Sequence, residues 1–255
     1  MPIRRLLTLC VFTLLCVASV QAQRQRAVRS GLPFFTPQQP PPQTGPCHTF
    51  GLVRPGLKAS YLSVTPDGSA TYTITWISDQ PTRTETTQQV QTPQGTGNAV
   101  TVVDGEIVGN LRAMKHINVK TTIAVPILGS ITTTVDIDFV PSLALGPQDG
   151  WCVGKTWSVG PTMQTITSST PGLPVQIIHN NIELAEGKVL AVNEKITVNG
   201  VEYNTVKYAS WAMGANNALQ PSITWTSTEH NVVVRQEAYD SVGNLVTTTT
   251  ATHIE

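Results

Sequence analysis

Two carboxylates, Asp136 and Asp138, are the residues whose type and spacing come closest to an active site. They alternate with Val135, Ile137 and Phe139 in a predicted strand, so both share one face, about 7 Å apart by the strand rise. Carboxylates at such a separation serve glycoside hydrolysis or bind Ca²⁺. Solvated aspartates on a strand face are the alternative. The sequence therefore predicts no catalytic residue and no metal site, and Asp136 and Asp138 are the positions at which to test that prediction.

Short motifs of common catalytic sites are absent from the sequence. It contains no Gly-x-Ser-x-Gly, His-Glu-x-x-His or Cys-x-x-Cys segment and no phosphate-binding glycine loop. The five histidines lack metal-ligand spacing, and His179 is the one to inspect, with a surface or turn position as the alternative. We expect no cofactor. A non-catalytic role is favoured, although enzymatic activity is left undecided.

Apolar and aromatic positions indicate binding. The stretch TIAVPILGSI, residues 122–131, is typical of a hairpin tip, and exposed apolar tips contact partners, membranes or ligands. The alternative is that the tip folds over the core. With the hairpin 61–76 and the loop 210–222, it would form the rim of a binding surface. The predicted ligand contacts are Ile127, Leu128, Tyr203, Trp211 and Met213.

Four tryptophans allow a second binding mode. Large aromatic side chains either stack on carbohydrate or anchor a core, and a chain with 6% aromatic residues favours the core. The four are Trp151, Trp157, Trp211 and Trp225.

The N-terminus has the pattern of a secretory signal peptide over residues 1–22. Arg4 and Arg5 precede an apolar run, and small residues close the segment at Ala22. The run is too short to predict a membrane span, so none is expected after cleavage. Residues 23–46 are rich in Pro and Gln, which predicts a disordered or semi-rigid tether. We expect a secreted or periplasmic protein.

Removal of the signal peptide changes the charge and the cysteine count. Without Arg4 and Arg5, 14 basic residues oppose 16 acidic ones, a net charge of −2. The sequence has no basic stripe of the kind that binds nucleic acid, so no nucleic-acid partner is expected. Cys47 and Cys152 are the cysteines that remain, and in an oxidising compartment they are expected to form a disulfide. Two separate buried thiols are the alternative.

From residue 47 to residue 255 the chain alternates apolar and polar residues with period two. The 36 threonines suit the solvated face of a sheet. Asn199-Gly200 predicts a two-residue hairpin turn with Val198 opposite Val201. The apolar phase changes after Tyr203, which predicts a β-bulge near Asn204 and a strongly bent sheet. The fold class is all-β: a single antiparallel domain, either a curved half-open barrel or a two-sheet sandwich, with little or no helix.

Three motifs carry a family likeness. The segment 154–157 (GKTW) precedes the hairpin 198–207 (VNGVEYNTVK), and the strand pair 225–235 (WTSTEHNVVVR) follows. This order resembles bacterial envelope proteins of unknown function, which are similar to lipoprotein carriers in forming a curved, half-open β-barrel. The resemblance covers about residues 150–253. It implies a concave ligand-binding face but no functional residue, and Asn199 replaces the proline of the family motif.

Two classes of function follow. The first is a non-catalytic exported protein that binds an apolar small molecule or an envelope protein. The second is a cryptic hydrolase or a carbohydrate-binding module that uses Asp136, Asp138 or the tryptophans. A structural role at the cell surface is a third alternative. A deep apolar cavity would favour the first class, whereas clustered carboxylates beside an open aromatic shelf would favour the second.

Overall fold

The computed structural model describes residues 47–51, 53–79, 82–92, 95–125, 129–148, 150–214 and 221–255. The predicted signal peptide and tether lie outside these residues. Across the described ranges no helix has the length and apolar character needed to span a membrane. The strands are β1 (Cys47–His48), β2 (Lys58–Thr65), β3 (Gly68–Asp79), β4 (Thr82–Thr92), β5 (Gly95–Val108), β6 (Leu111–Val125), β7 (Gly129–Pro147), β8 (Trp151–Cys152), β9 (Thr156–Val159), β10 (Thr162–Ser169), β11 (Gln176–Val198), β12 (Val201–Gly214), β13 (Ser222–Ser227), β14 (Val233–Tyr239) and β15 (Leu245–Ile254).

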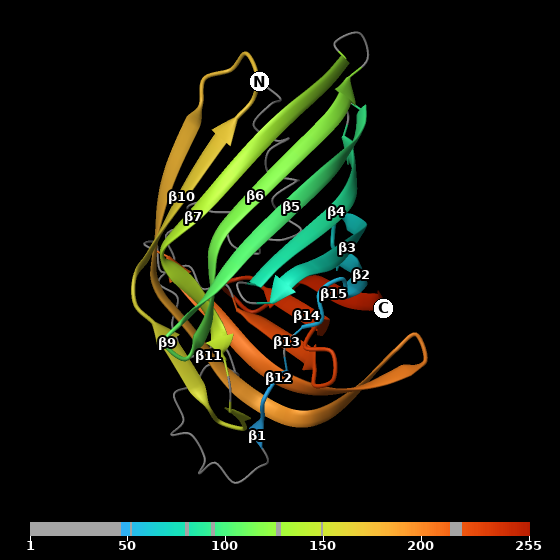
Figure 1. Cartoon of the computed structure of the whole chain (residues 1–255), viewed down its shortest axis with the longest axis vertical. Helices are drawn as coiled ribbons and strands as arrows, with labels where there is room; N and C mark the ends of the chain where they lie inside the picture. Colours follow the sequence, from blue (N-terminus) through green and yellow to red (C-terminus); the bar gives the residue numbers. More distant parts are fainter. Residues whose placement is uncertain are drawn as a thin grey trace.

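Twelve of these strands form a closed antiparallel barrel (Figure 1). Their order is β10-β7-β6-β5-β4-β3-β2-β15-β14-β13-β12-β11, and pairing of β10 with β11 completes the ring. Strand β9 adds to β11, while β1 and β8 form a separate two-stranded sheet. The predicted class, one antiparallel all-β structure, is confirmed. Of the two predicted architectures the barrel is the one observed, and its ring is closed.

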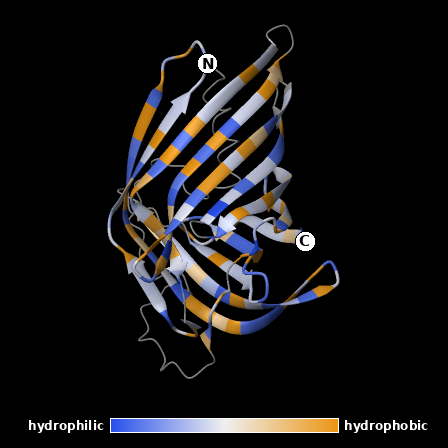
Figure 2. Ribbon diagram, in the orientation of Figure 1, coloured by the Kyte–Doolittle hydropathy of each residue, from blue (hydrophilic) through white to orange (hydrophobic). Residues whose placement is uncertain are grey.

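Hydrophobic and hydrophilic residues alternate along many of the strands (Figure 2), and in β2, β6 and β7 this alternation separates a buried face from a more exposed one. In β7 the side chains of Val135, Ile137 and Phe139 are almost completely buried, whereas Asp136 and Asp138 reach solvent. This is the alternation predicted for a strand that is wet on one side. The inner residues of β5, β6, β7, β11 and β12 pack into one apolar cluster.

The predicted hairpin joins β11 to β12. Asn199 and Gly200 have φ angles of 49° and 81°, and Val198 pairs with Val201, so the turn and its register are confirmed. A bulge does follow, but it lies in β11 rather than at Asn204 in β12. Asn193, with φ of 64°, is the extra residue there, opposite the step from Thr205 to Val206. Asparagine tolerates positive φ, which explains why the β11 side accepts the insertion.

An aromatic cluster lies beside the β1–β8 sheet, at the lower end of the barrel as drawn in Figure 1, where β1 is labelled. Phe50 contacts Trp151 edge to face, with 5.2 Å between ring centroids, and Trp151 contacts Trp157 at 5.6 Å. These rings pack on the inner side chains of β11 and β12. The disulfide between Cys47 and Cys152, as predicted, joins β1 to β8 and fixes the two segments that carry the rings.

The strands have unequal lengths, so part of the wall projects beyond the rest (Figure 1). Strand β12 ends at Gly214, opposite Ile182 of β11. Residues 176–181 of β11 continue past that point and pair with β10. The hairpin of β10 and β11 therefore stands above the end of β12, at the opposite end of the molecule from the aromatic cluster.

Candidate functional site

Asp136 and Asp138 lie on the outer face of β7, beside His116 of β6. Nδ1 of His116 is 2.8 Å from Oδ1 of Asp138, and its Nε2 is 3.6 Å from Oδ1 of Asp136. Asn118 donates a hydrogen bond to the same Asp136 oxygen at 2.7 Å. Neighbouring side chains thus engage both carboxylates. Within the described ranges, no group of three or more His, Cys, Asp or Glu side chains is arranged to bind a metal ion.

His116 and Asp138 belong to a polar row that crosses the outside of six strands. His179, the histidine singled out in the sequence, lies at one end of the row, where its Nδ1 is 3.2 Å from the Thr165 hydroxyl. Arg83 and Asp104 form an ion pair at the other end, at 2.9 Å. Opposite charges and hydrogen bonds alternate along the row, so it keeps this band of the wall solvated. In order the row is Arg83, Asp104, His116, Asp138, Thr165 and His179.

The predicted ligand contacts that the structure describes, Tyr203, Trp211 and Met213, all lie on β12. Trp211 and Met213 lie near the end of β12, and the Trp211 indole donates to Glu186 at 2.9 Å. Tyr203 lies eight residues earlier on the same strand, about 26 Å away by strand rise, and its ring contacts His230. Ile127 and Leu128 lie outside the described residues. The three described ligand contacts are therefore spread along β12, and a shared site for all five stays a prediction.

Two segments of the predicted rim have other roles. Residues 210–214, expected in a loop, continue strand β12, and residues 215–220 lie outside the described residues. In the hairpin 61–76, Tyr61 and Trp76 point into the barrel and are buried in its apolar core. Burial raises the pKa of Tyr61, whose hydroxyl donates to the carbonyl of Val233 at 3.0 Å.

Three of the four tryptophans, Trp151, Trp157 and Trp225, are buried and offer no open shelf. Trp151 and Trp157 belong to the buried aromatic cluster, with 5% and 6% of their surface exposed. Trp225 lies on the outer face between two cations: Nζ of Lys207 is 4.8 Å, and the Arg235 guanidinium carbon 5.5 Å, from its ring centroid. Both cations lie over the ring, which is a cation–π arrangement. These three rings therefore offer no exposed face on which a carbohydrate could stack, as a carbohydrate-binding module requires.

Charged partners complete the surroundings of Trp225. Its indole donates to Glu194 at 3.1 Å, and Arg235 pairs with Glu237. Tyr239 donates to Glu237 at 2.6 Å. Burial and this carboxylate raise the pKa of Tyr239 to about 12. Each charge in the group has an opposite charge or a donor beside it, so the group stabilises the outer wall.

Four exposed large apolar side chains lie close together in sequence at the β10–β11 hairpin. Leu173, Val175, Ile177 and Ile178 expose 52%, 58%, 59% and 52% of their surface. Ile177 faces outward, whereas Ile178 shares the inner face with Ile166 of β10 and Ile137 of β7. Ile178 is exposed despite facing inward because β12, the next strand, stops below it. Ile177 and Ile178 thus expose apolar side chains on both faces of the hairpin, a feature typical of a contact site.

Sequence reasoning did not identify this hairpin as a site. Its apolar residues alternate as in any strand. They are exposed because β12, the neighbouring strand, ends at Gly214 and does not extend beside them. One signal was available: no Asp, Glu, Lys or Arg occurs between Lys155 and Glu183. Exposed edge strands normally carry such charges, which prevent association with other strands.

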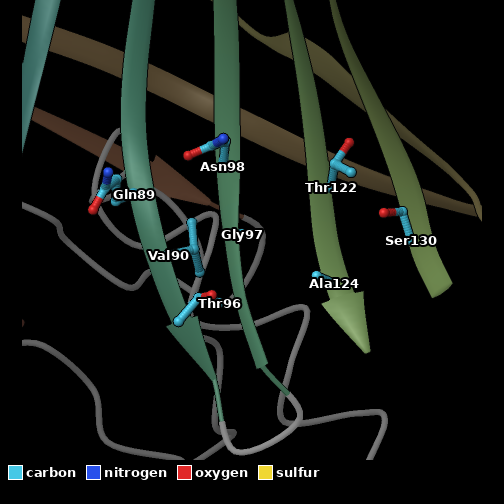
Figure 3. A pocket seen from close by; sticks show the side chains of 8 residues that line it. All are labelled: Gln89, Val90, Thr96, Gly97, Asn98, Thr122, Ala124 and Ser130. Carbon is cyan, nitrogen blue, oxygen red and sulfur yellow. The ribbon is translucent and has the colours of Figure 1, made fainter. Parts of the chain in front are cut away.

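A shallow pocket of about 410 Å³ lies at the same end of the molecule, on the outside of β4 to β7 (Figure 3). Gly97 lies at its centre, where a side chain is excluded because a Cβ would come within 2.1 Å of the Thr122 carbonyl oxygen. The lining has hydroxyl and amide groups but no charged side chain. It therefore suits a neutral hydrogen-bonding contact. The lining residues are Gln89, Val90, Thr96, Gly97, Asn98, Thr122, Ala124 and Ser130.

Comparison with known proteins gives little further information. No family model and no curated protein sequence matches the chain. Among solved structures, the chain is similar to a protein of Bacteroides fragilis that is described as exported and as having a YmcC-like fold. The sequence identity is 10%, the TM-score is 0.34, and the match covers 82% of this chain and 100% of the other. This similarity carries no functional argument, so the resemblance to envelope carriers stays a prediction.

Proposed function

We propose that the protein is an exported, non-catalytic binding protein that contacts an apolar ligand or a protein partner through the β10–β11 hairpin. The observation that carries the proposal is the exposure of four large apolar side chains on this one hairpin. Burying such side chains is favourable by about 1.5–3 kcal/mol each when burial is complete, so their exposure favours a partner.

The two ends of the barrel support this assignment. The aromatic cluster of Phe50, Trp151 and Trp157 is buried at the lower end, whereas the projecting hairpin exposes apolar side chains at the other end. The two aspartates considered for catalysis are hydrogen-bonded to His116 and Asn118. A binding role therefore explains more of the structure than a hydrolytic one.

Export is supported by the disulfide between Cys47 and Cys152. Disulfides persist in oxidising compartments and are rare in the cytosol. The sequence pattern of residues 1–22 agrees with this location, which intact mass of the isolated protein would test by placing the mature N-terminus near Gln23.

Photo-crosslinking tests the binding site. Benzoylphenylalanine replaces Ile177 in the full chain, expressed in a host that exports it, and the intact mass is recorded after irradiation. We expect an adduct at Ile177 and none at a matched control, Leu62, which is apolar and exposed on β2 but lies in a strand paired on both edges. An unmodified mass at position 177 would contradict the proposed function.

A further inference from the structure

The projecting part of β11 has one edge without a neighbouring strand among the described residues. Residues 176–181 pair with β10 on one side, and on the other side β12 ends at Gly214, opposite Ile182. An edge of this kind presents backbone N–H and C=O groups in the pattern that another strand requires. The hairpin therefore offers main-chain hydrogen bonds as well as apolar side chains.

The side chains beside this edge favour an uncharged, apolar strand. Ile177 and Ile178 lie on opposite faces and are both more than half exposed. Formal charges are absent from the segment between Lys155 and Glu183, so two copies of it would meet without like-charge repulsion. Natural edge strands avoid self-association by charges and short length. This edge lacks the charges.

The edge is also compatible with two-fold symmetry. An axis perpendicular to the sheet relates two antiparallel copies of the same strand, and the residue on the axis lies opposite itself. Ile178 is the midpoint of residues 175–181. Pairing about this residue places Ile177 opposite His179 and Gln176 opposite Asn180, so two amide side chains meet beside the isoleucine pair.

We propose that the β11 edge binds a second copy of the same chain, through antiparallel pairing of residues 175–181 centred on Ile178. The proposal rests on the proposed function, because it names the partner of the same hairpin. Pairing joins the projecting walls of two barrels into one continuous sheet, with β10 and β11 of one copy beside β11 and β10 of the other.

The size of the contact sets the expected strength. The pairing joins one short edge segment, residues 175–181, from each copy, so the contact lies near or below roughly 1,000 Å², the lower limit for a specific interface. We therefore expect a reversible dimer with a dissociation constant in the range of about 1–100 µM.

Sedimentation of the full mature chain over about 1–200 µM tests the association. We expect a monomer at the lowest concentration and a dimer at the highest. Ile178→Lys should keep the chain monomeric throughout, because it places two like charges opposite each other. The control is Val64→Lys, at an exposed apolar position of a strand paired on both edges, and it should leave the dimer unchanged.

Cysteine pairing tests the register. Ile178→Cys should form a disulfide-linked dimer on mild oxidation, because the residue faces its own copy. Gln176→Cys alone should not, but a mixture of Gln176→Cys with Asn180→Cys should. Intact mass after digestion confirms that the native Cys47–Cys152 bond is retained in each variant.

The outcomes separate this inference from the proposed function. A chain that stays monomeric at every concentration, or a dimer that persists in Ile178→Lys, overturns the second-copy proposal. If the adduct at Ile177 is then a different molecule, the binding function stands with another partner. If no adduct forms there either, both fail. An adduct of twice the chain mass, with the register-specific disulfides, supports both.

Discussion

Adding one methyl group at Gly187 should destabilise the protein through Trp157. Gly187 of β11 pairs with Trp157 of β9, and the indole ring lies over the glycine. A Cβ at position 187 would lie 2.0, 2.3 and 2.6 Å from three ring atoms. Carbon atoms pack at about 3.5–4.0 Å, so the ring must move by roughly 1.5 Å. Gly187→Ala therefore tests whether this contact is as close as the structure shows.

The magnitude follows from what the ring touches. Trp157 is 6% exposed and contacts Trp151 and Tyr208, with centroid separations of 5.6 and 5.9 Å. Overpacking a tight core costs about 1–3 kcal/mol, and losing a buried tryptophan costs about 3–5 kcal/mol. We expect Gly187→Ala to lower the free energy of unfolding by about 3 kcal/mol, since the displaced ring disturbs two neighbours but keeps part of its burial.

Urea unfolding followed by far-ultraviolet circular dichroism measures this change without relying on tryptophan fluorescence. In a Trp157→Ala background the same substitution should be neutral or stabilise by about 0.4–1 kcal/mol, because the obstacle is gone and alanine restricts the unfolded chain. Gly160→Ala is the matched control, since no atom lies within 4 Å of a Cβ there. An equal loss from Gly187→Ala in both backgrounds would refute the reasoning.

Three further predictions concern the lower end and one turn. Replacing Cys47 and Cys152 together by Ala should lower the free energy of unfolding by about 4–5 kcal/mol in the chain-entropy account, measured by urea unfolding; a loss below 1 kcal/mol would contradict it. Burial lowers the pKa of His48, against a hydrogen bond with the Thr228 backbone. Stability should therefore fall as the pH drops from about 6.5 through the folded-state pKa, and thermal melts of His48→Gln should show a smaller fall. Burial opposes ionisation of Asp240, but hydrogen bonds from Asn244 and the turn backbone lower its pKa below 3.8. Its contribution should be present above about pH 4 and lost as the pH falls through the folded pKa, and Asp240→Ala should lose about 1 kcal/mol at neutral pH but little in acid, as urea titrations at each pH would show.

Much of the fold could be predicted from the sequence because its signals are local. The alternation in β7 and the Asn199-Gly200 turn are set by neighbouring residues, and both are confirmed. The disulfide between Cys47 and Cys152 followed from a count of cysteines. The bulge was placed correctly along the hairpin but in the wrong strand, because a change of apolar phase does not say which strand carries the extra residue.

The candidate site was harder to predict because it depends on contacts between distant segments. Ile178 has the sequence environment of a buried residue, and its exposure results from where β12 ends relative to β11. Trp225 is a large aromatic residue of the type expected to anchor a core. In the structure it lies on the outer face, where Lys207 and Arg235 from the neighbouring strands lie over its ring. Periodicity assigns a face to each residue. It does not assign the length of the neighbouring strand, which decides whether that face is covered.

The pairing of β2 with β15, strands far apart in the sequence, has a consequence for biosynthesis. Strand β2 pairs with β15, and Lys58 and Glu255 exchange backbone hydrogen bonds of 2.8 and 2.9 Å. During synthesis this edge of β2 stays unpaired until residues 245–254 of β15 have been made. Both cysteines are already present about a hundred residues before that point. The covalent link can thus form on an open sheet. Once formed, it holds the start of the domain beside its middle and shortens the search by which the last strand finds the first.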